Sequence, residues 1–589
     1  MNINNKSEKE NTYDAIVVGT GVSGGWAAKE LSEGGLKTLV LERGRNVRHV
    51  RDYPTMNKHS WELPYRDQLT AKERKDYPVQ LRTGYTVKQS TKHWWVKDTE
   101  QPYTEKKGSF DWIRGYHVGG RSLLWGRQVY RWSKQDFEAN AKDGVGIDWP
   151  IRYNDIKKWY DHVENFIGVS GMKENLSQLP DAQFLPPMEM NCVEKDFRKN
   201  LFEKFGRTYT IGRVAHVTKS HNGRGPCQSR NLCIRGCPYG AYFSSNSSTL
   251  PAAEATGNMT LRPNSIVHSI IYDENKEKAT GVRVLDSETL EMTEYYAKII
   301  FLNASTVNST LIMLNSKSNR FENGFGNDSG ELGHNMMDHH FKAGARAKFD
   351  GYKDSYYYGN RPNSGYLARF RNLKDNDMNF LRGYGYQGGA SRTGWYRAAE
   401  EGLIGNDLLD TAATPGEWRM GLNAFGEVLP YHDNKMYLDY NKKDKWGMPT
   451  VVFETEIKEN ELNMREDMKN SAAEMLDACG FKDVEPYDNR YDMGNGIHEM
   501  GTARMGIDPK TSVLNKWNQV HAAKNVFVTD GSCMTSSSCV NPSITYMALT
   551  ARATNYAISE LKKRNLSVSY THLRAHETVL DLVCRLLLE

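Results

Sequence analysis

Residues 14–25 read DAIVVGTGVSGG, a mostly apolar run that leads into the glycine pattern Gly19-x-Gly21-x-x-Gly24. Such a run predicts a buried β-strand, and the glycines mark a tight turn into a helix. Gly19 permits the turn, Gly21 lets the backbone approach a pyrophosphate, and Gly24 lets the helix pack closely on the strand. The helix N-terminus then faces the phosphates. The stretch therefore predicts a site for a dinucleotide.

The residues that follow complete a β-α-β unit. Residues 23–31 have helical character and end at the pair Gly34-Gly35, and residues 37–42, KTLVLE, read as a second buried strand. Glu42 closes that strand, where a carboxylate can accept hydrogen bonds from ribose hydroxyls. Together the strands, the helix and the acid are specific for a dinucleotide, but they do not separate FAD from NAD.

Length and composition describe a large globular protein. The 589 residues predict a sizeable core and two domains, and 39% hydrophobic and 25% charged residues are globular values. The net charge of +5, with both signs interspersed, is too small to indicate nucleic-acid binding. No stretch approaches about 18 apolar residues, which predicts no membrane span of its own. The first residues carry no signal-peptide core, so the chain taken alone is expected in the cytoplasm.

Three cysteines are closely spaced: Cys227, Cys233 and Cys237, in the pattern C-x5-C-x3-C. Thiolates so near one another can converge on one metal centre. Three interpretations stay open: reduced thiols in a packed loop, a zinc site completed by a ligand such as His221, and an iron–sulfur cluster. Zinc sites usually pair cysteines as C-x2-4-C, which this spacing fits poorly. A cluster beside a dinucleotide site indicates an enzyme that passes electrons on singly.

Two kinds of sequence pattern alternate along the chain. Residues 296–314 read as a strand that runs into a helix, and residues 525–530 and 543–563 as a strand and a last helix. Between them, residues 340–450 are rich in Tyr, Gly, Asn and Arg, which favours an antiparallel sheet with long loops. The alternation predicts two interwoven domains. The aromatic stretches Tyr356-Tyr357-Tyr358-Gly359-Asn360 and Trp395-Tyr396 are candidates for stacking on a sugar ring, or are ordinary surface or core aromatics.

Three further motifs carry glycines or polar residues. Residues 118–126, VGGRSLLWG, place paired glycines ahead of a serine, which suits close approach to a flat ring or a phosphate, or a plain turn. His498 lies in IHEMGTARMG at 497–506, and Asn541 in VNPSIT at 540–545. By themselves, a lone histidine is more often structural than catalytic, and an Asn-Pro step is usually a turn.

In this order the motifs resemble the glucose-methanol-choline (GMC) oxidoreductases, which bind FAD, over the chain to about residue 565. The matching segments are the glycine pattern with ERG at 42–44, GGRS at 119–122, LNASTVNSTLIMLNS at 302–316, LGHNMMDH at 332–339, HEMGTARMG at 498–506, DGS at 530–532 and NPSIT at 541–545. The resemblance implies an α/β fold: a Rossmann-like FAD-binding domain interwoven with an α+β substrate domain built on an antiparallel sheet.

Within that family, DWPIRY at 148–153 and the cysteine spacing most resemble the catalytic subunits of bacterial FAD-dependent sugar dehydrogenases, of the glucose dehydrogenase and glucoside 3-dehydrogenase type. The cysteines of that branch bind a [3Fe-4S] cluster. Leu124 stands where some relatives carry a histidine that is bonded to the flavin. A leucine has no nucleophile, so we expect FAD to be held non-covalently.

The resemblance also implies roles for single residues. His498 falls on the catalytic histidine of the family, and Asn541 falls on its partner. The residues implied to contact FAD are Gly19, Gly21, Gly24, Glu42, Gly119, Gly120, Ser122, Asp530 and Gly531, with Val267 near the adenine. The implied ligands of the [3Fe-4S] cluster are Cys227, Cys233 and Cys237.

The chemistry expected of such a site follows from its residue types. Alcohol oxidation removes a hydroxyl proton and a carbon-bound hydride, and an imidazole accepts a proton well at physiological pH. We expect neutral His498 to take the proton, Asn541 to donate to the oxygen of a sugar or other alcohol, and the flavin to take the hydride. The electrons would leave through the cluster to a cytochrome or membrane acceptor.

The relatives lack their own export signal and leave the cytoplasm with a small partner subunit, which makes the periplasm the alternative to the cytoplasm. Two other functions stay open: a GMC oxidase that reduces oxygen to hydrogen peroxide, and a binding or assembly subunit without turnover. The presence of both His498 and Asn541 speaks against the last of these.

The expected domain boundaries follow the two alternating sequence patterns and the motifs. The FAD-binding domain is expected at residues 1–148, 211–335 and 496–566, and the substrate domain at 149–210 and 336–495. The tail 567–589 resembles a translated sequencing-library adapter, so no functional weight falls on it.

Overall fold

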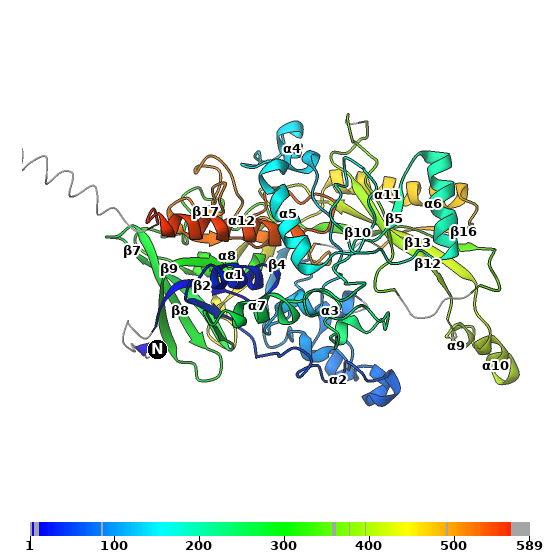
Figure 1. Ribbon diagram of the computed structural model, residues 1–589, viewed down its shortest axis with the longest axis horizontal. Coiled ribbons are helices and arrows are strands. Elements are labelled where there is room, and N and C mark those ends of the chain that lie inside the picture. Colours follow the sequence, from blue (N-terminus) through cyan, green and yellow to red (C-terminus); the bar gives the residue numbers. More distant parts are fainter. Residues whose placement is uncertain are drawn as a thin grey trace, which may run out of the picture.

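The computed structural model describes residues 3–4, 11–83, 86–355, 361–375, 377–394, 396–489 and 493–566. The adapter-like tail 567–589, the aromatic stretch 356–360 and Trp395 lie outside these described residues. Figure 1 shows an elongated molecule with one sheet and its helices at the left and a second sheet with its helices at the right.

The first sheet is built around β2 (Thr12–Val18) and contains parallel strands. The four residues of β3 (Thr38–Leu41) are all buried, as expected for a parallel strand covered on both faces. The main path runs in the order β17 (Gln519–Val520), β18 (Ala523–Val528), β9 (Met292–Leu302), β2, β3 and β6 (Met259–Arg262). All neighbours from β18 to β6 are parallel, whereas β17 is antiparallel to β18.

An antiparallel extension continues the first sheet beyond β9. The strands β7 (Ser265–Asp273) and β8 (Lys278–Asp286) pair with each other, and β8 pairs with β9. The short β1 (Ile3–Asn4) adds a parallel pairing to β9.

Helices pack on this first sheet and on one another. The helix α1 (Val22–Glu33) follows β2 and contacts α7 (Thr249–Ala255) and α12 (Ser543–Lys562). The helix α8 (Thr306–Asn315) follows β9, and α5 (Tyr153–Ile167) packs against α12. The hydroxyls of Tyr160 and Thr545 share a 2.8 Å hydrogen bond at that contact. The predicted boundaries, which assign α5 to the substrate domain, stay a prediction.

The second sheet is antiparallel throughout. Its order is β16 (Lys482–Asp488), β10 (His339–Phe349), β13 (Trp418–Glu427), β12 (Tyr384–Arg392), β11 (Gly365–Leu367) and β5 (Tyr209–Ile211). The helix α11 (Glu459–Ala478) packs on it through buried methionines such as Met464 and Met468. The helix α6 (Cys192–Phe205) packs against β5 and β12.

Smaller elements complete the molecule. A third sheet contains β14 (Lys435–Lys443), β15 (Pro449–Glu454) and β4 (Thr104–Lys107). The remaining helices are α2 (Ala71–Arg74), α3 (Pro78–Thr83), α4 (Lys134–Asp143), α9 (Arg397–Glu400) and α10 (Gly405–Ala413). In Figure 1, α9 and α10 extend from the body at the lower right.

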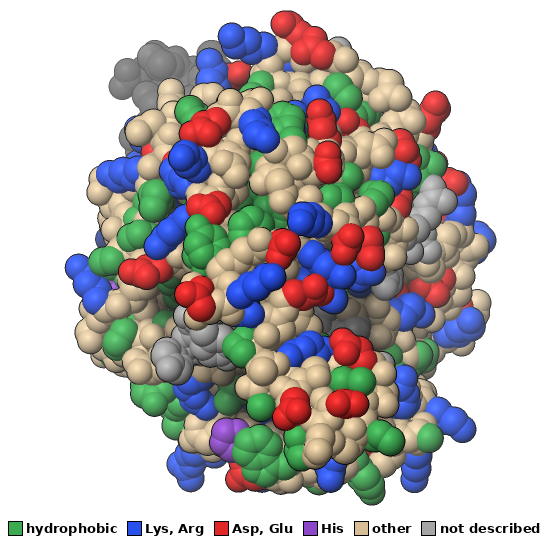
Figure 2. Space-filling model, turned by 90° about the vertical axis from the view of Figure 1, so that its right-hand side faces the viewer, with side chains coloured by type: hydrophobic (Ala, Val, Ile, Leu, Met, Phe, Trp, Pro, Cys, Tyr) green, Lys and Arg blue, Asp and Glu red, His purple; other side chains and the backbone are tan. Residues whose placement is uncertain are grey.

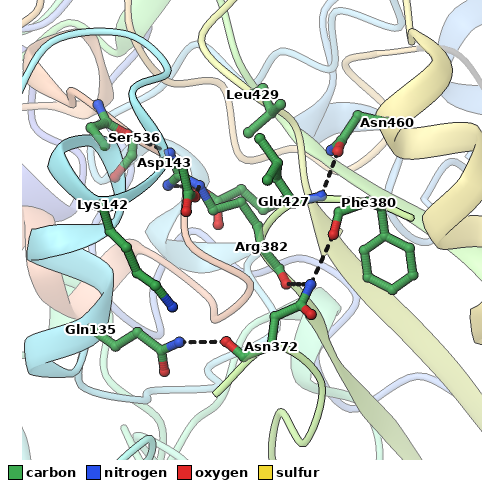
Figure 3. A network of polar contacts seen from close by, with 12 residues as sticks. Gln135, Lys142, Asp143, Asn372, Phe380, Arg382, Glu427, Leu429, Asn460 and Ser536 are labelled. Carbon is green, nitrogen blue, oxygen red and sulfur yellow. Dashed lines mark hydrogen bonds and ion pairs between the residues drawn. The ribbon is translucent and has the colours of Figure 1, made fainter. Parts of the chain in front are cut away.

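A buried arginine joins α4 to the second sheet (Figure 3). Arg382 is only 1% exposed and forms ion pairs with Asp143 of α4 at 2.5 Å and with Glu427 of β13 at 3.1 Å. Breaking such a buried pair by removing one partner costs about 3–5 kcal/mol, because the other charge stays buried without compensation. The network therefore fixes the second sheet firmly against a segment that precedes it in the chain.

The strand order confirms the predicted fold class. The segments of the first sheet come from residues 3–41, 259–302 and 519–528, and those of the second from 209–211 and 339–488. A parallel Rossmann-like sheet is thus interwoven with an antiparallel one, as the sequence predicts. Within the described residues, no helix is long and apolar enough to cross a membrane. Figure 2 shows basic and acidic side chains interspersed over one face of the molecule.

Candidate active site

A cavity of about 570 Å³ is lined by residues from both large sheets. Four parallel strands end at it: Gly19, Glu42 and Asn303 directly follow β2, β3 and β9, Asp530 lies two residues after β18, and all four line the cavity. Ligands of open α/β sheets bind at this edge of the strands. Of the predicted residues, the lining contains Gly19, Gly21, Glu42, Gly120, Ser122, Val267, His498, Asp530, Gly531 and Asn541. The cavity thus brings together both halves of the predicted site.

The three glycines after β2 have different spatial roles. Gly19 has φ +97°, and a Cβ there would lie 2.4 Å from the Asn303 carbonyl oxygen. A Cβ on Gly24 would lie 2.0 Å from the carbonyl oxygen of Gly19, so this glycine is needed for the packing of α1. A Cβ on Gly21 would meet nothing within 4 Å, because Gly21 faces the open cavity. Gly21 therefore leaves room where a phosphate group would lie.

Buried polar atoms around that room have no protein partner. The helix α1 starts without a side-chain hydrogen bond at its N-cap, Gly21. The hydroxyl of Ser23 and the Oδ1 atom of Asn303 are buried without a hydrogen-bond partner, and both residues line the cavity. An uncapped helix N-terminus with spare polar groups suits the pyrophosphate of a dinucleotide. These residues fit FAD.

Glu42 lies directly after β3 and is almost fully buried. Its Oε2 atom accepts from the Thr20 backbone N–H at 3.2 Å, and its Oε1 atom from the Gly44 N–H at 3.0 Å. The Thr20 hydroxyl also donates to it. Burial raises the pKa of Glu42 above the usual carboxyl range, against these hydrogen bonds. The carboxylate is therefore held in place at the cavity wall, where the ribose is predicted to bind.

The paired glycines of the second motif divide between packing and lining. A Cβ on Gly119 would lie 1.6 Å from the Asn246 side-chain oxygen, and Gly119 does not line the cavity. A Cβ on Gly120 would come within 3.4 Å of the Gly21 Cα atom. The Ser122 hydroxyl donates to the Gly119 carbonyl at 2.5 Å and accepts from the Ser245 N–H at 3.0 Å. Gly119 and Ser122 thus support the wall that Gly120 forms.

Asp530 and Gly531 follow β18 and also line the cavity. The Oδ1 atom of Asp530 accepts from the Ser532 N–H at 3.0 Å, and its Oδ2 atom accepts from the Ser309 hydroxyl on α8. Burial raises the pKa of this carboxyl. Gly531 is required by packing, since a Cβ there would lie 2.3 Å from the Glu499 carbonyl oxygen. This turn therefore joins α8 to the segment that carries His498.

His498 is buried at the cavity and touches a second histidine. Its Nδ1 atom lies 2.8 Å from Nδ1 of His339, which starts β10. The His339 Nε2 atom lies 2.8 Å from the Ser538 carbonyl oxygen and 3.2 Å from that of Ser537. Burial lowers the pKa of His339 to about 4 and that of His498 well below its usual value. Both rings are therefore neutral at physiological pH.

The carbonyl oxygens fix the tautomers of both rings. Because Ser537 and Ser538 only accept there, the Nε2 atom of His339 must carry the hydrogen, and its Nδ1 atom accepts. The Nδ1 atom of His498 must then donate to it. This leaves Nε2 of His498 without a hydrogen, 3.5 Å from the Asn541 Nδ2 atom. The site therefore offers a bare imidazole nitrogen beside an amide NH₂ group, which can accept a proton and donate a hydrogen bond.

Sequence reasoning quoted His339 in a motif but missed its contact with His498. The neighbouring Asp338 is also part of the site, because its carboxylate accepts from the His498 backbone N–H at 3.0 Å. Its other oxygen accepts from the N–H groups of Gly494 at 2.7 Å and Gly496 at 3.1 Å. Two successive residues of the LGHNMMDH segment thus hold the loop and the ring of His498.

An ion pair joins the glycine-rich motif to the histidine segment. Arg121 donates to Glu499 through both terminal nitrogens, at 3.0 and 2.7 Å. The Glu499 side chain is 3% exposed and that of Arg121 25%. The bidentate geometry holds the residue next to His498 in one orientation.

Two phenylalanines from the second sheet also form part of the cavity wall. Phe341 of β10 and Phe425 of β13 line it, with ring centroids 5.2 Å apart and planes 14° from parallel. Gln387 and Asn363 add amide groups to the same lining. Sequence reasoning missed these residues and named Tyr396, which is 50% exposed and does not line the cavity.

The three cysteines lie on one loop, of which Cys233 lines the cavity. The Cys233 sulfur is 3.9 Å from Nε2 of the buried His216. Burial raises the pKa of the Cys227 thiol, and the nearby Cys233 and Cys237 raise it further. In the part of the chain that the structure describes, no three His, Cys, Asp or Glu side chains form a site for a metal ion.

This leaves the zinc interpretation without support from the described residues, and the roles of the three thiols stay a prediction. His221, the suggested fourth zinc ligand, lies with Nε2 2.9 Å from the Asn165 carbonyl oxygen. A [3Fe-4S] cluster places irons and sulfides between its thiolates and stays a prediction.

Two family models, both described as GMC oxidoreductase, match residues 13–341 and 430–550. The chain belongs to the GMC oxidoreductase family. It is therefore an FAD-dependent oxidoreductase that acts on CH–OH donors.

Curated relatives in this family match almost the whole chain. The 2-methyl-1,2-propanediol dehydrogenase of Mycolicibacterium austroafricanum is 27% identical, over 92% of this chain and 94% of its own. The fructose dehydrogenase large subunit of Gluconobacter japonicus is 25% identical, over 93% and 98%. The crystal structure of pyridoxine 4-oxidase from Mesorbium loti has the same fold, with a TM-score of 0.57 at 14% identity, over 92% of this chain and 98% of that one.

Proposed function

We propose that this GMC oxidoreductase oxidises a sugar or another polyhydroxylated alcohol at one CH–OH carbon. The bare Nε2 atom of His498 takes the hydroxyl proton, and the Asn541 NH₂ group donates to the substrate oxygen as negative charge develops on it. FAD, when bound, supplies the acceptor for the hydride. The observation that carries this proposal is the histidine pair, which leaves Nε2 of His498 free to accept beside the Asn541 amide.

FAD would be held by the residues that border free space in the cavity or that have hydrogen-bonding groups without a protein partner. Gly21 and the start of α1 would take the pyrophosphate, Glu42 the ribose and Val267 the adenine, while Gly120 and Gly531 would flank the flavin ring. Leu124 lines the cavity without offering a nucleophile, so binding is non-covalent. Acid precipitation should release all of the yellow colour; colour that stays with the denatured chain would contradict this.

Two features favour a polyhydroxylated substrate. The parallel rings of Phe341 and Phe425 offer an apolar face, and Asn363 offers an amide that can bond to hydroxyl groups. Relatives that match nearly the whole chain are named fructose dehydrogenase large subunit and gluconate 2-dehydrogenase flavoprotein. The test is a panel of sugars, polyols and simple alcohols with an artificial dye under argon. Turnover of simple alcohols alone would overturn the sugar assignment.

For the route of the electrons we favour a [3Fe-4S] cluster held by Cys227, Cys233 and Cys237, leading to a cytochrome or membrane acceptor. The position of Cys233 on the cavity wall supports it, because an electron carrier at this loop would lie beside the flavin cavity. A partner subunit would bind to this enzyme and carry it to the periplasm. The name of the Gluconobacter relative, a large subunit, supports a subunit assembly.

A second candidate is an oxidase. Paromamine 6'-oxidase of Streptomyces fradiae is 24% identical over 95% of this chain, so the family match also includes an enzyme named as an oxidase. An oxidase would release hydrogen peroxide in air at the rate at which substrate is consumed. A dehydrogenase would turn over rapidly with the dye and release little peroxide.

A further inference from the structure

We propose that Gln387, Gln128 and Tyr130 form a hydrogen-bonded chain that fixes the orientation of the Asn541 amide, so that its NH₂ group and not its oxygen faces the substrate. These three are positioning residues. The inference rests on the proposed function of Asn541 and adds what determines which end of its side chain faces the reacting oxygen.

The hydrogen-bonded chain links β12 of the second sheet to the loop before α12 through side-chain amides. Gln387 of β12 donates from Nε2 to Oδ1 of Asn541 at 2.8 Å. Gln128 donates from Nε2 to Oε1 of Gln387 at 2.6 Å. The Tyr130 hydroxyl in turn donates to Oε1 of Gln128 at 2.5 Å. Each amide thus accepts at its oxygen from one neighbour and donates from its nitrogen to the next.

Tyr130 sets the direction of this chain. Its phenol is fully buried, and burial raises its pKa far above neutrality, so it stays protonated. The phenol hydroxyl donates its hydrogen to Oε1 of Gln128. The Tyr130 ring is held by stacking on Tyr366, with centroids 4.1 Å apart. Because Tyr130 donates, Gln128 must turn its oxygen toward Tyr130 and its nitrogen toward Gln387. The same orientation then applies to Gln387, whose nitrogen donates to the oxygen of Asn541.

The polarity matters because Asn541 has a second acceptor beside it. Its Nδ2 atom lies 3.5 Å from the bare Nε2 atom of His498. A reversed amide would place its oxygen against that nitrogen and against the oxygen of the substrate, and lone pairs would face lone pairs at both contacts. The amide chain prevents this. It also makes the chemistry depend on β12 of the second sheet, whereas Asn541 itself lies in the loop just before α12.

The variant Gln387→Glu tests the direction of the chain. A carboxylate only accepts, so Asn541 must turn its NH₂ group toward residue 387 and its oxygen toward the substrate. Loss of one donor to a developing oxyanion reduces kcat about 100-fold or more. We therefore expect flavin reduction by substrate to fall about 100-fold at pH 8. Below the pKa of the new carboxyl group its O–H can donate again, and the rate should recover toward that of the parent enzyme.

The matched control is Gln387→Ala, which removes the contact without adding a titrating group. We expect a smaller loss that does not recover at low pH. The thermal midpoint gives a readout that needs no turnover: the deficit of Gln387→Glu relative to the parent should shrink as the pH falls. A rate loss in Gln387→Glu that is independent of pH and equal to that of Gln387→Ala would overturn the proposal.

Tyr130→Phe extends the test to a residue outside the cavity lining. Without the phenol hydrogen both directions of the chain become available, so kcat should fall several-fold while KM stays close to the parent value. Unchanged kcat in this variant, with normal FAD content, would remove Tyr130 from the chain. Asn541→Ala separates the two levels of inference. Normal flavin reduction in that variant would refute the proposed role of Asn541. The orientation of its amide would then have no effect on catalysis.

Discussion

The ring of His339 fixes that of His498 through a single contact, 2.8 Å between their Nδ1 atoms. His339 can only accept at this atom, because its other nitrogen faces two carbonyl oxygens. His339→Leu should therefore release the tautomer of His498 and slow flavin reduction about tenfold or more, as expected for a displaced general base. Stopped-flow reduction at several pH values measures the effect.

A matched control for His339 lies next to it in the chain. His340 is buried on the same strand but does not line the cavity. His340→Leu should keep the reduction rate of the parent enzyme. An equal loss in both variants would mean that His339 acts only through the packing of β10.

Removal of the proposed base should separate cofactor binding from turnover. His498→Ala should keep its full content of FAD, because no contact of this ring supports the glycine turn or Glu42. Flavin reduction by substrate should fall by about 100-fold or more, the usual contribution of a general base. Absorbance of the bound flavin measures both quantities in one sample. Near-normal reduction would exclude His498 from the mechanism.

Gly21 and Gly24 of the same glycine pattern should respond differently to substitution by alanine. Gly21→Ala should fold with parental stability, because the new methyl group would meet nothing within 4 Å, but it should bind FAD more weakly since it fills the predicted phosphate site. Gly24→Ala should lower the thermal midpoint of the apoprotein, because its methyl group would lie 2.0 Å from a carbonyl oxygen. Equal FAD affinity in Gly21→Ala and the parent would place the pyrophosphate elsewhere.

Asp338 should make the stability of the protein depend on pH. Burial, with a further contribution from the Glu499 charge, raises the pKa of its carboxyl group from 3.8 to about 7 in the folded protein. The folded state then holds a proton that the unfolded chain loses above about pH 4. The stability that this carboxyl contributes is thus fully present below pH 4, falls as the pH rises and is lost above about pH 7.

The measurement is the difference in free energy of unfolding between the parent and Asp338→Asn, followed by urea denaturation from pH 4 to pH 8. The difference should decrease with rising pH, since the asparagine does not titrate. A difference that stays constant over this range would mean that Asp338 keeps an ordinary pKa.

The proposed [3Fe-4S] cluster predicts the iron and sulfide content of the purified protein. Protein purified without oxygen should contain about three irons and matching sulfide per chain if the three thiolates hold a [3Fe-4S] cluster. Cys233→Ser should lose the iron, keep flavin reduction by substrate and stop electron delivery to a cytochrome. Cys192→Ser, a thiol on α6, serves as the control and should keep the iron. Iron-free protein with full acceptor activity would favour the oxidase.

The residues predicted from sequence are those that local spacing or the order of the family motifs identifies. Gly19, Gly21 and Glu42 follow from a strand–turn–helix pattern in one short stretch, and all three line the cavity. His498 and Asn541 follow from the order of motifs in the family. In the structure the Asn541 Nδ2 atom lies 3.5 Å from the His498 Nε2 atom. Their chemical roles stay a proposal.

The residues that sequence reasoning missed act through contacts between distant segments. His339 gains its role from a ring 159 residues away, and Gln387 from an amide 154 residues away. Phe341 and Phe425 are ordinary strand aromatics in the sequence, and only the pairing of β10 with β13 places them together. The predicted aromatic stretch 356–360 lies outside the described residues.

The interweaving of the two sheets has a consequence for how the chain reaches its folded state. Ile300 pairs with Val526, and β5 pairs with β11, so neither sheet is complete until segments far apart in the chain have been synthesised. Such a topology has a high contact order, and proteins of this kind fold slowly. A ribosome-bound chain that stops before residue 519 lacks β17, β18 and α12, and it exposes the apolar faces that they cover. The first nucleotide-binding motif is therefore made early but matures last, and the nascent chain is open to aggregation in the interval.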